Sequence, residues 1–147
     1  RALAAPAALG RGLSAPPGMA RKPPRRTRER IVETALRILP RWAEALNGLE
    51  AYSHLIVVLW LDRAKRARAA SQVRPEGRAD MPEVGTFATR TPRRPNPIGL
   101  STPRLVRRDG PTLWVTGIDA WPGTPILDIK GYTLDYATPT GFVRATR

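Results

Sequence analysis

The alternation of apolar and polar positions separates a patternless N-terminal stretch from a region with strand character. Residues 1–30, rich in Ala, Pro, Gly and Arg, show neither helical nor alternating periodicity. The segment IVETALRIL, which begins at Ile31 and stops before Pro40, alternates in part and predicts a strand. The run from Leu55 to Leu61 is apolar throughout and rich in β-branched residues, which predicts a buried central strand.

The remaining segments predict short elements joined by turns. A short helix is expected in PRWAEALNGLE, because Pro40 suits a first helical position and Gly48 ends the pattern. Residues 63–80 are charged and end in a loop with Pro and Gly, so they predict a solvent-exposed excursion. Four short segments follow with turn signals between them: GTFATR, GLSTPRLVRR, TLWVTGID and PILDIKGY. This spacing predicts a mainly β fold, an antiparallel barrel or sandwich with one or two short helices.

A length of 147 residues predicts a single domain with tails. The pattern divides the chain into a basic Pro/Ala/Arg-rich N-terminal arm (1–30), a β domain (31–136) and a C-terminal extension (137–147). A basic arm of this kind either binds phosphates nonspecifically or is simply solvated. Both interpretations remain open from the sequence.

Charge points to a polyanionic partner. The chain has 25 Lys and Arg against 12 Asp and Glu, a formal net charge of +13, which favours nucleic acid first and an anionic membrane surface second. A GC-rich genome, in which Arg and Ala are common regardless of function, is the alternative explanation. The net charge is therefore compatible with both explanations.

Several classes of site and location are excluded by what the sequence lacks. Without cysteine there is no disulfide framework, thiolate zinc site or cysteine nucleophile, and the single His54 leaves no His-rich site, so no metal is expected. The longest apolar run is much shorter than the ~20 residues of a membrane-spanning helix. The N-terminal residues are broken by Pro and Gly before any compact apolar segment forms, so we expect no signal peptide and a cytoplasmic protein.

Most familiar enzyme motifs are also missing. No GxGxxG, GxxxxGK[ST] or GxSxG occurs in a suitable context, and no βαβ alternation can be drawn. A Rossmann-type methyltransferase or dehydrogenase and a serine triad enzyme are therefore not expected. The segment RRPNPIGLS stands out, because Pro95 and Pro97 restrict the backbone on both sides of Asn96. It is either a rigid ligand-binding loop or a simple turn between strands.

Three ordered motifs resemble the TrmO (YaeB, TsaA-like) family of tRNA methyltransferases. YSHLIVVLWLD resembles the family's FSH-hydrophobic strand, GTFATRTPRRPNPIGLS its signature G-F-A-T-R-S-P-x-R-P-N-P-I-G-L-S, and GIDAWPGTPILDIKGY its G-x-D-x-x-x-G-T-P-x-L-D-I-K-P-Y. The resemblance covers about Ile31 to Tyr136. Two departures are notable: Gly131 stands where proline is typical, and nothing in residues 1–30 matches the family's opening strand, which is therefore missing or diverged.

The resemblance implies a small antiparallel β-barrel methyltransferase that binds S-adenosylmethionine without a Rossmann sheet. It further implies a homodimer with the cofactor pocket near the subunit interface, and tRNA as partner, methylated on N6 of N6-threonylcarbamoyladenosine in the anticodon loop. Phosphate contacts would supply much of the affinity for tRNA, and a base in a single-stranded loop can be splayed into a pocket. The alternative is a non-catalytic or differently specific RNA- or small-molecule-binding protein of the same barrel family.

The resemblance and side-chain chemistry together nominate two sets of site residues. The cofactor-binding set is Ser53, His54, Arg90, Arg94, Asn96, Leu100 and Ser101; the catalytic set is Asp128, Lys130 and Tyr132. An arginine suits the cofactor carboxylate or a tRNA phosphate equally well, and the Asn96 amide can both donate and accept. The catalytic three alternate along one predicted strand and so share a face, where Lys130 and Tyr132 could orient the base. The alternatives are a salt-bridged face for this set and a structural role for His54.

Overall fold

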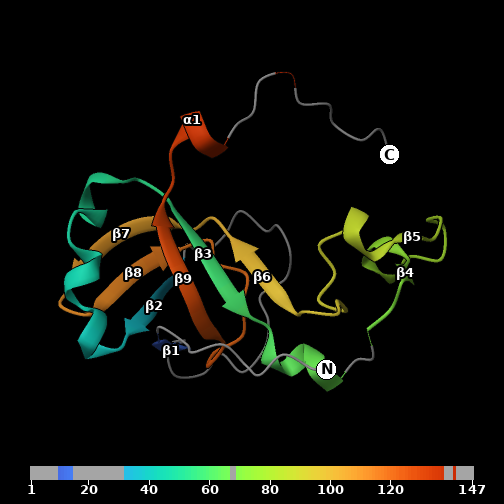
Figure 1. The fold of residues 1–147 in the computed structure, drawn as a ribbon, viewed down its shortest axis with the longest axis horizontal. Coiled ribbons are helices and arrows are strands. Elements are labelled where there is room, and N and C mark those ends of the chain that lie inside the picture. The colour runs from blue at the N-terminus through green and yellow to red at the C-terminus, as the bar shows by residue number, and fades with distance from the viewer. Residues whose placement is uncertain (1–9, 15–31, 67–68, 138–140, 142–147) are drawn as a thin grey trace.

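The fold is dominated by one antiparallel sheet of seven strands, in the order β6-β3-β9-β1-β2-β8-β7 (Figure 1). The computed structural model describes residues 10–14, 32–66, 69–137 and 141. The strands are β1 (Gly10–Ser14), β2 (Glu33–Ile38), β3 (Leu55–Trp60), β6 (Ile98–Ser101), β7 (Arg104–Asp109), β8 (Thr112–Thr116) and β9 (Pro125–Gly131). The mainly β class predicted from the sequence is thus confirmed.

The two strands predicted from the apolar pattern are present. Strand β2 ends before Pro40, and β3 lies between β6 and β9. Along β3 the side chains of Leu55, Val57 and Leu59 are buried while the alternate ones are only half-buried. The apolar run therefore serves two different environments, a fully buried face and a partly covered one.

The predicted helix is replaced by three separate 3-10 turns: η1 (Pro40–Trp42), η2 (Glu44–Leu46) and η3 (Leu49–Ala51). Gly48 interrupts the helical path, because its φ of 89° lies in the left-handed region. Pro40 does occupy the first position of η1, as the sequence suggests. Short 3-10 turns thus take the place of one α-helix.

A closed barrel is not confirmed. In the hydrogen-bonding order, β6 and β7 stand at opposite ends of the sheet, although only Thr102 and Pro103 separate them in the chain. The edge strand β7 approaches the segment that leads into β3, where a single bridge pairs His54 with Arg104. Beside it the Leu55 amide donates to the Pro103 carbonyl (3.0 Å) and the Leu105 amide to the Ser53 carbonyl (2.9 Å). These contacts join β7 to the start of β3 locally, without a continuous ladder.

The N-terminal part differs from the predicted arm. Strand β1 lies in the middle of the sheet, between β9 and β2, and pairs Leu13 with Leu36. GRGLS contains two glycines and a single apolar residue, so neither β-propensity nor alternation marks it as a strand. Part of the predicted arm therefore forms a strand that its sequence did not indicate. The rest of the predicted arm, and most of the predicted C-terminal extension, lies outside the described residues.

The core fills the space on the inner face of the bent sheet. Its buried members are Leu36, Ile38, Leu46, Leu55, Val57, Leu59, Leu113, Val115 and Ile126. Trp60 and Trp114 lie within apolar strand patterns, which predict core positions, but both are only half-buried. Because Leu113 and Val115 take the inward positions of β8, alternation turns Trp114 outward, where the Arg107 guanidinium lies 4.3 Å from its ring centre.

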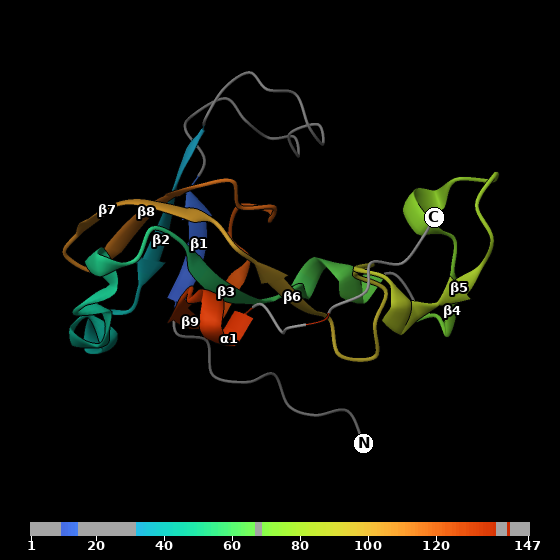
Figure 2. The same ribbon diagram turned by 90° about the horizontal axis from the view of Figure 1, so that it is seen from above.

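The excursion predicted for residues 63–80 is longer in the structure: the described residues of 62–96 stand away from the main sheet in both views (Figures 1 and 2). It contains η4 (Asp62–Arg66), β4 (Gln72–Val73), η5 (Pro75–Gly77), β5 (Val84–Gly85) and η6 (Thr86–Ala88), with β4 and β5 paired as a small second sheet. The strand predicted in GTFATR is wrong beyond Gly85. There the chain turns, because the buried Thr86 hydroxyl donates to the Ala70 carbonyl. A four-residue helix, α1 (Leu134–Ala137), follows β9.

Arg108 on β7 ties the 3-10 turns to the sheet. Its Nη1 donates to Asn47 Oδ1 (2.9 Å) and to Glu50 Oε1 (2.8 Å), and its Nη2 donates to the Ala43 carbonyl (3.1 Å). The Glu50 pKa is lowered, first by a hydrogen bond from its own backbone amide and then by the bond from Arg108. The charged form of Glu50 is therefore favoured in the folded state.

Replacing Glu50 with glutamine is expected to lower the free energy of unfolding at neutral pH. A carboxyl whose pKa is lower in the folded state contributes stability above its unfolded pKa, and that contribution is lost as the pH falls through the folded pKa. The difference between Glu50→Gln and wild type should thus shrink below pH 4.5, the ordinary pKa of this group. Urea unfolding between neutral and acid pH measures it, with the exposed Glu44→Gln as control. A difference that stays constant with pH would contradict the assignment.

Candidate functional site

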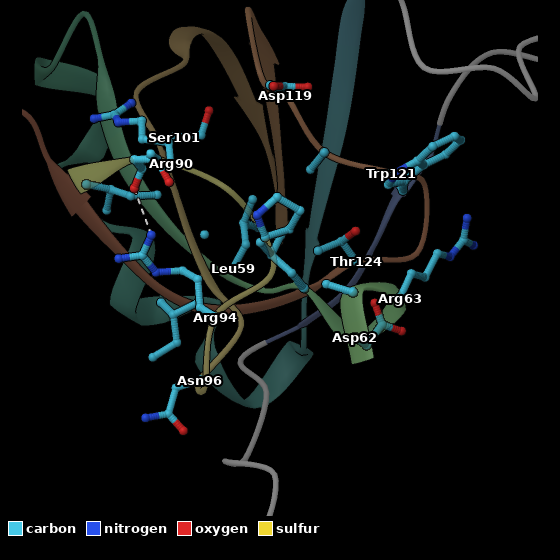
Figure 3. Close-up of a pocket in the computed structure, with 18 of the residues that line it drawn as sticks. Leu59, Asp62, Arg63, Arg90, Arg94, Asn96, Ser101, Asp119, Trp121 and Thr124 are labelled. Atoms are coloured by element: carbon cyan, nitrogen blue, oxygen red, sulfur yellow. Dashed lines mark hydrogen bonds between the residues drawn. The ribbon is translucent and has the colours of Figure 1, made fainter. Parts of the chain in front are cut away.

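A cavity of about 910 Å³ opens along the edge strand β6. We call it the edge trough; its walls are β6 and the end of β3, the loop 89–96, the start of η4, and the loop 117–124 between β8 and β9 (Figure 3). Figure 3 shows Arg90 and Ser101 on one side of the trough and Trp121 with Arg63 on the other. Segments distant in the sequence therefore meet around one space.

Five of the seven predicted cofactor-binding residues line the edge trough: Arg90, Arg94, Asn96, Leu100 and Ser101. The rigid RRPNPIGLS segment thus forms a cavity wall and is more than a connection between strands. Its last residues become β6, where the Asn96 carbonyl accepts a hydrogen bond from the Ile98 amide (2.7 Å). Ser53 and His54 lie elsewhere, as described below.

Arg94 stabilises the loop 86–94 through hydrogen bonds to the backbone of that loop. Its Nη1 donates to the carbonyls of Thr89 (2.8 Å) and Thr86 (3.3 Å), and its guanidinium lies 5.5 Å from the ring centre of Phe87. The side chain is only partly exposed. Arg94 therefore shapes the wall of the trough in addition to lining it, whereas Arg90 is exposed and makes no such bonds within the described structure.

Replacing Arg94 with alanine is expected to loosen the loop 86–94 without unfolding the sheet. The substitution removes two hydrogen bonds and the contact with Phe87, and hydrogen bonds to a charged donor contribute about 1.5–3 kcal/mol each. Amide hydrogen exchange should accelerate in residues 86–94 and stay unchanged in β2 and β8. Unchanged exchange in the loop would show that Arg94 does not hold it; Arg94→Lys should recover little, since lysine lacks the planar fork.

The loop between β8 and β9 supplies residues that were not nominated from the sequence. Asp119, Trp121 and Thr124 line the edge trough. Arg63 of η4 fastens this loop, because its Nη2 donates to the Pro122 carbonyl (3.1 Å) and its guanidinium lies 5.8 Å from the Trp121 ring centre. These residues belong to the GIDAWPGTP motif, which marks the loop in the sequence but does not by itself indicate that the loop binds a ligand.

The edge trough combines opposite charges with apolar surface. Arg63, Arg90 and Arg94 line it together with Asp62 and Asp119. Apolar groups complete the lining: Leu59, Leu61, Pro92 and the half-exposed Trp121. This set suits a ligand that carries an anionic group, a cationic group and a flat ring. Across the described ranges, no cluster of three or more Asp, Glu or His side chains is placed to hold a metal ion.

His54 and Tyr132 line a second, smaller cavity together with Thr102, about 340 Å³ in volume. We call it the junction hollow, because it lies where β3 begins, β7 begins and β9 ends. Ser53 Oγ lies at hydrogen-bond distance from His54 Nδ1 (3.0 Å), and the Tyr132 amide donates to the His54 carbonyl (3.0 Å). Thr102 lines both cavities, so the two adjoin at that residue.

The three predicted catalytic residues are not brought together in the edge trough. A bulge in β9 shifts the register between the pairs Leu59–Ile126 and Val58–Asp128, so Asp128 and Lys130 face away from the core. The Lys130 ammonium pairs with the Asp128 carboxylate, whose other oxygen accepts from the Ile129 amide (2.9 Å). The pair thus belongs to the outer face of the sheet. Of the three residues, Tyr132 lines the junction hollow.

Gly131 receives the ring of Tyr52. A Cβ at position 131 would lie 2.6 Å from two ring atoms of Tyr52, closer than real contacts allow. Glycine at this position, where the resembled family has proline, is therefore matched to an aromatic ring packed against the backbone. The departure from the family pattern has a local steric explanation.

Comparisons with known proteins agree on one relationship. The family model of the tRNA-methyltransferase O N-terminal domain matches residues 17–137. A probable S-adenosyl-L-methionine-binding protein from Archaeoglobus fulgidus is 48% identical over 98 residues, which make up 67% of this chain and 26% of the relative. A rat tRNA (adenine(37)-N6)-methyltransferase is 36% identical over 103 residues, 70% of this chain and 24% of the relative.

The crystal structure of TrmO from Pseudomonas aeruginosa shares the fold. It superposes with a TM-score of 0.61 at 33% identity, over 77% of this chain and 47% of that chain. The chain therefore spans about a quarter of the two relatives and about half of the solved chain. No helix in the described part of the chain is long and apolar enough to cross a membrane.

Proposed function

Because the chain belongs to the tRNA-methyltransferase O family, we propose that it binds S-adenosylmethionine in the edge trough and transfers a methyl group to an adenosine of tRNA. The observation that carries this proposal is the lining of the trough. It gathers the motif residues Arg90, Asn96 and Ser101 around a space that also offers carboxylates and apolar surface. A volume of about 910 Å³ is ample for one cofactor of this size.

The chemistry of the lining fits the cofactor. Arg90 is exposed and suited to pair with the carboxylate in the methionine part of S-adenosylmethionine. Asp62 and Asp119 add negative charge to the lining, which suits the ammonium and sulfonium groups of the cofactor. Trp121 and Leu100 offer apolar surface for the adenine ring, and Ser101 offers a hydroxyl. The bound cofactor supplies a methyl group on a positively charged sulfur, and the chain's task is to align it with the acceptor.

Charge and the relatives' names support a tRNA acceptor. The net charge of +13 favours a polyanion, and several relatives are named tRNA (adenine(37)-N6)-methyltransferases. We propose N6 of N6-threonylcarbamoyladenosine in the anticodon loop as the acceptor. The accepting nitrogen must lose one proton, and Tyr132 is the nominated residue that lies in a cavity next to the trough. Asp128 and Lys130 lie on the outer face of the sheet, where they would contact RNA that passes over that face.

The remaining proposals concern assembly and location. A homodimer is supported by the edge position of β6 and by its exposed apolar side chains, Ile98 (46% exposed) and Leu100 (53%). We further propose that the β6–β7 segment closes the sheet into a barrel at the His54–Arg104 bridge. A tRNA-modifying enzyme would act in the cytoplasm, where its substrate is found.

Two measurements test the proposal and separate it from its rival. Isothermal titration calorimetry with S-adenosylmethionine should show binding, and no heat at millimolar cofactor would sink the proposal. Nucleoside mass spectrometry after incubation with tRNA should show a new N6-methylated adenosine. Cofactor and RNA binding without methylated product would instead support the non-catalytic protein of the same family.

A further inference from the structure

The junction hollow is built from polar side chains on a fixed backbone. His54, Thr102 and Tyr132 line it, and each can both donate and accept hydrogen bonds through its side chain. Three backbone hydrogen bonds surround it, from the amides of Leu55, Leu105 and Tyr132. The three side chains are therefore presented by strand ends and not by a free loop.

Each side chain that lines the hollow also matches a feature of a nucleobase. Tyr132 and His54 are flat rings on which a base can stack, and stacking on aromatic side chains is the common way in which proteins hold unstacked RNA bases. The Thr102 hydroxyl and the imidazole can bond to a base edge. Ser53 Oγ, 3.0 Å from His54 Nδ1, leaves Nε2 as the ring nitrogen available to a ligand.

Charge near the hollow favours a phosphate backbone beside the base. Arg104 is exposed and pairs with His54 through the backbone bridge, so its side chain starts next to the hollow. The nearest acidic group along β9, Asp128, is paired with Lys130. A nucleotide whose base enters the hollow would thus have a cation within reach of its phosphate.

We propose that the junction hollow receives the target adenine of single-stranded RNA, splayed out of its loop and held beside the edge trough. The inference rests on the proposed function, and it assigns His54 to the acceptor instead of the cofactor. The position of Thr102 in both linings carries the argument, because methyl transfer requires the acceptor and the cofactor to occupy adjoining spaces.

Crosslinking to the unaltered protein tests the placement. An anticodon stem-loop RNA with 8-azidoadenosine at the target position is irradiated with the full chain and S-adenosylmethionine, and the crosslinked peptide is identified by mass spectrometry. We expect the label on the peptides that hold His54 or Tyr132. A label confined to other peptides, or one that appears equally when the azide sits outside the loop, would overturn the proposal.

Substitutions at the hollow test how much its side chains contribute to RNA affinity. His54→Ala and Tyr132→Ala are each expected to weaken binding of the stem-loop RNA about tenfold, since one stacked base is lost, and to leave S-adenosylmethionine affinity within about twofold. Trp42→Ala is the matched control, because Trp42 is an exposed aromatic residue (43%) on η1 that lines neither cavity. Tyr132→Phe keeps the ring and should bind RNA as wild type does, which guards against a folding defect in Tyr132→Ala.

The outcomes separate this inference from the proposed function. Wild-type protein that binds no S-adenosylmethionine would defeat the proposed function itself. Wild type that binds cofactor and RNA, with His54→Ala and Tyr132→Ala unchanged for RNA, would defeat only the placement of the base. Loss of cofactor affinity in His54→Ala would show that His54 binds the cofactor, and it would also overturn the inference.

Discussion

Arg90→Ala is expected to weaken S-adenosylmethionine binding about tenfold, because a charge-assisted pair with a carboxylate contributes about 1.5–3 kcal/mol and the exposure of Arg90 reduces that value. Arg90 is exposed in the edge trough, whereas Arg94 already bonds to the carbonyls of its own loop. The value of kcat/KM for methyl transfer should fall by a similar factor, since the anchor is lost in the ground state and transition state alike. Calorimetry and a labelled-methyl assay measure the two quantities.

The matched control for this variant is Arg93→Ala. It removes the same charge from the same loop, and Arg93 is not part of the trough lining. Cofactor affinity should therefore stay near the wild-type value. If both variants bind alike, Arg90 acts only through the general positive potential of the loop, and the carboxylate has another partner.

Leu36→Ala is expected to lower the free energy of unfolding by about 2–5 kcal/mol, the usual range for a leucine deleted from a close-packed core. Leu36 is fully buried and pairs across the sheet with Leu113 of β8. On its other side, its strand β2 pairs with β1. Such a loss is a large share of the ~5–15 kcal/mol that stabilise a typical domain. Denaturant unfolding followed by tryptophan fluorescence measures the change.

The surface leucine on α1 provides the comparison. Leu134 is 70% exposed, so Leu134→Ala should change the stability by no more than about 0.5 kcal/mol. Equal losses for Leu36→Ala and Leu134→Ala would mean that the core is not packed as the structure shows.

The sequence predicted those elements whose own residues favour them. Strand β3 was found because its apolar run is long, and β2 because Pro40 bounds an alternating segment. Strand β1 was not found, because GRGLS pairs with the open edges of β2 and β9 in spite of its two glycines. The 3-10 turns of 40–51 could not be foreseen either, since their tether is Arg108, more than fifty residues away in the chain.

The site residues also divide into those that the local sequence indicates and those that depend on contacts distant in the chain. The loop residues Arg90, Arg94 and Asn96 could be nominated because their segment resembles the family signature, and Asn96 also because prolines flank it on both sides. The alternation expected from Asp128 to Lys130 is present, since the pairing of β9 is regular from Asp128 to Gly131, but the bulge between Ile126 and Asp128 turns their shared face away from the core. The pairing of Trp121 with Arg63 is a tertiary contact that no local pattern reveals.

The contact between Tyr52 and Gly131 bears on how this chain can change over time. Because the ring occupies the space of any Cβ at position 131, a side chain regained there would collide until position 52 has become smaller or has turned away. The cost of a side chain at position 131 therefore depends on the residue at position 52 and on whether its ring, which is 37% exposed, can turn aside. The two positions are energetically coupled, so substitutions at them should not be additive.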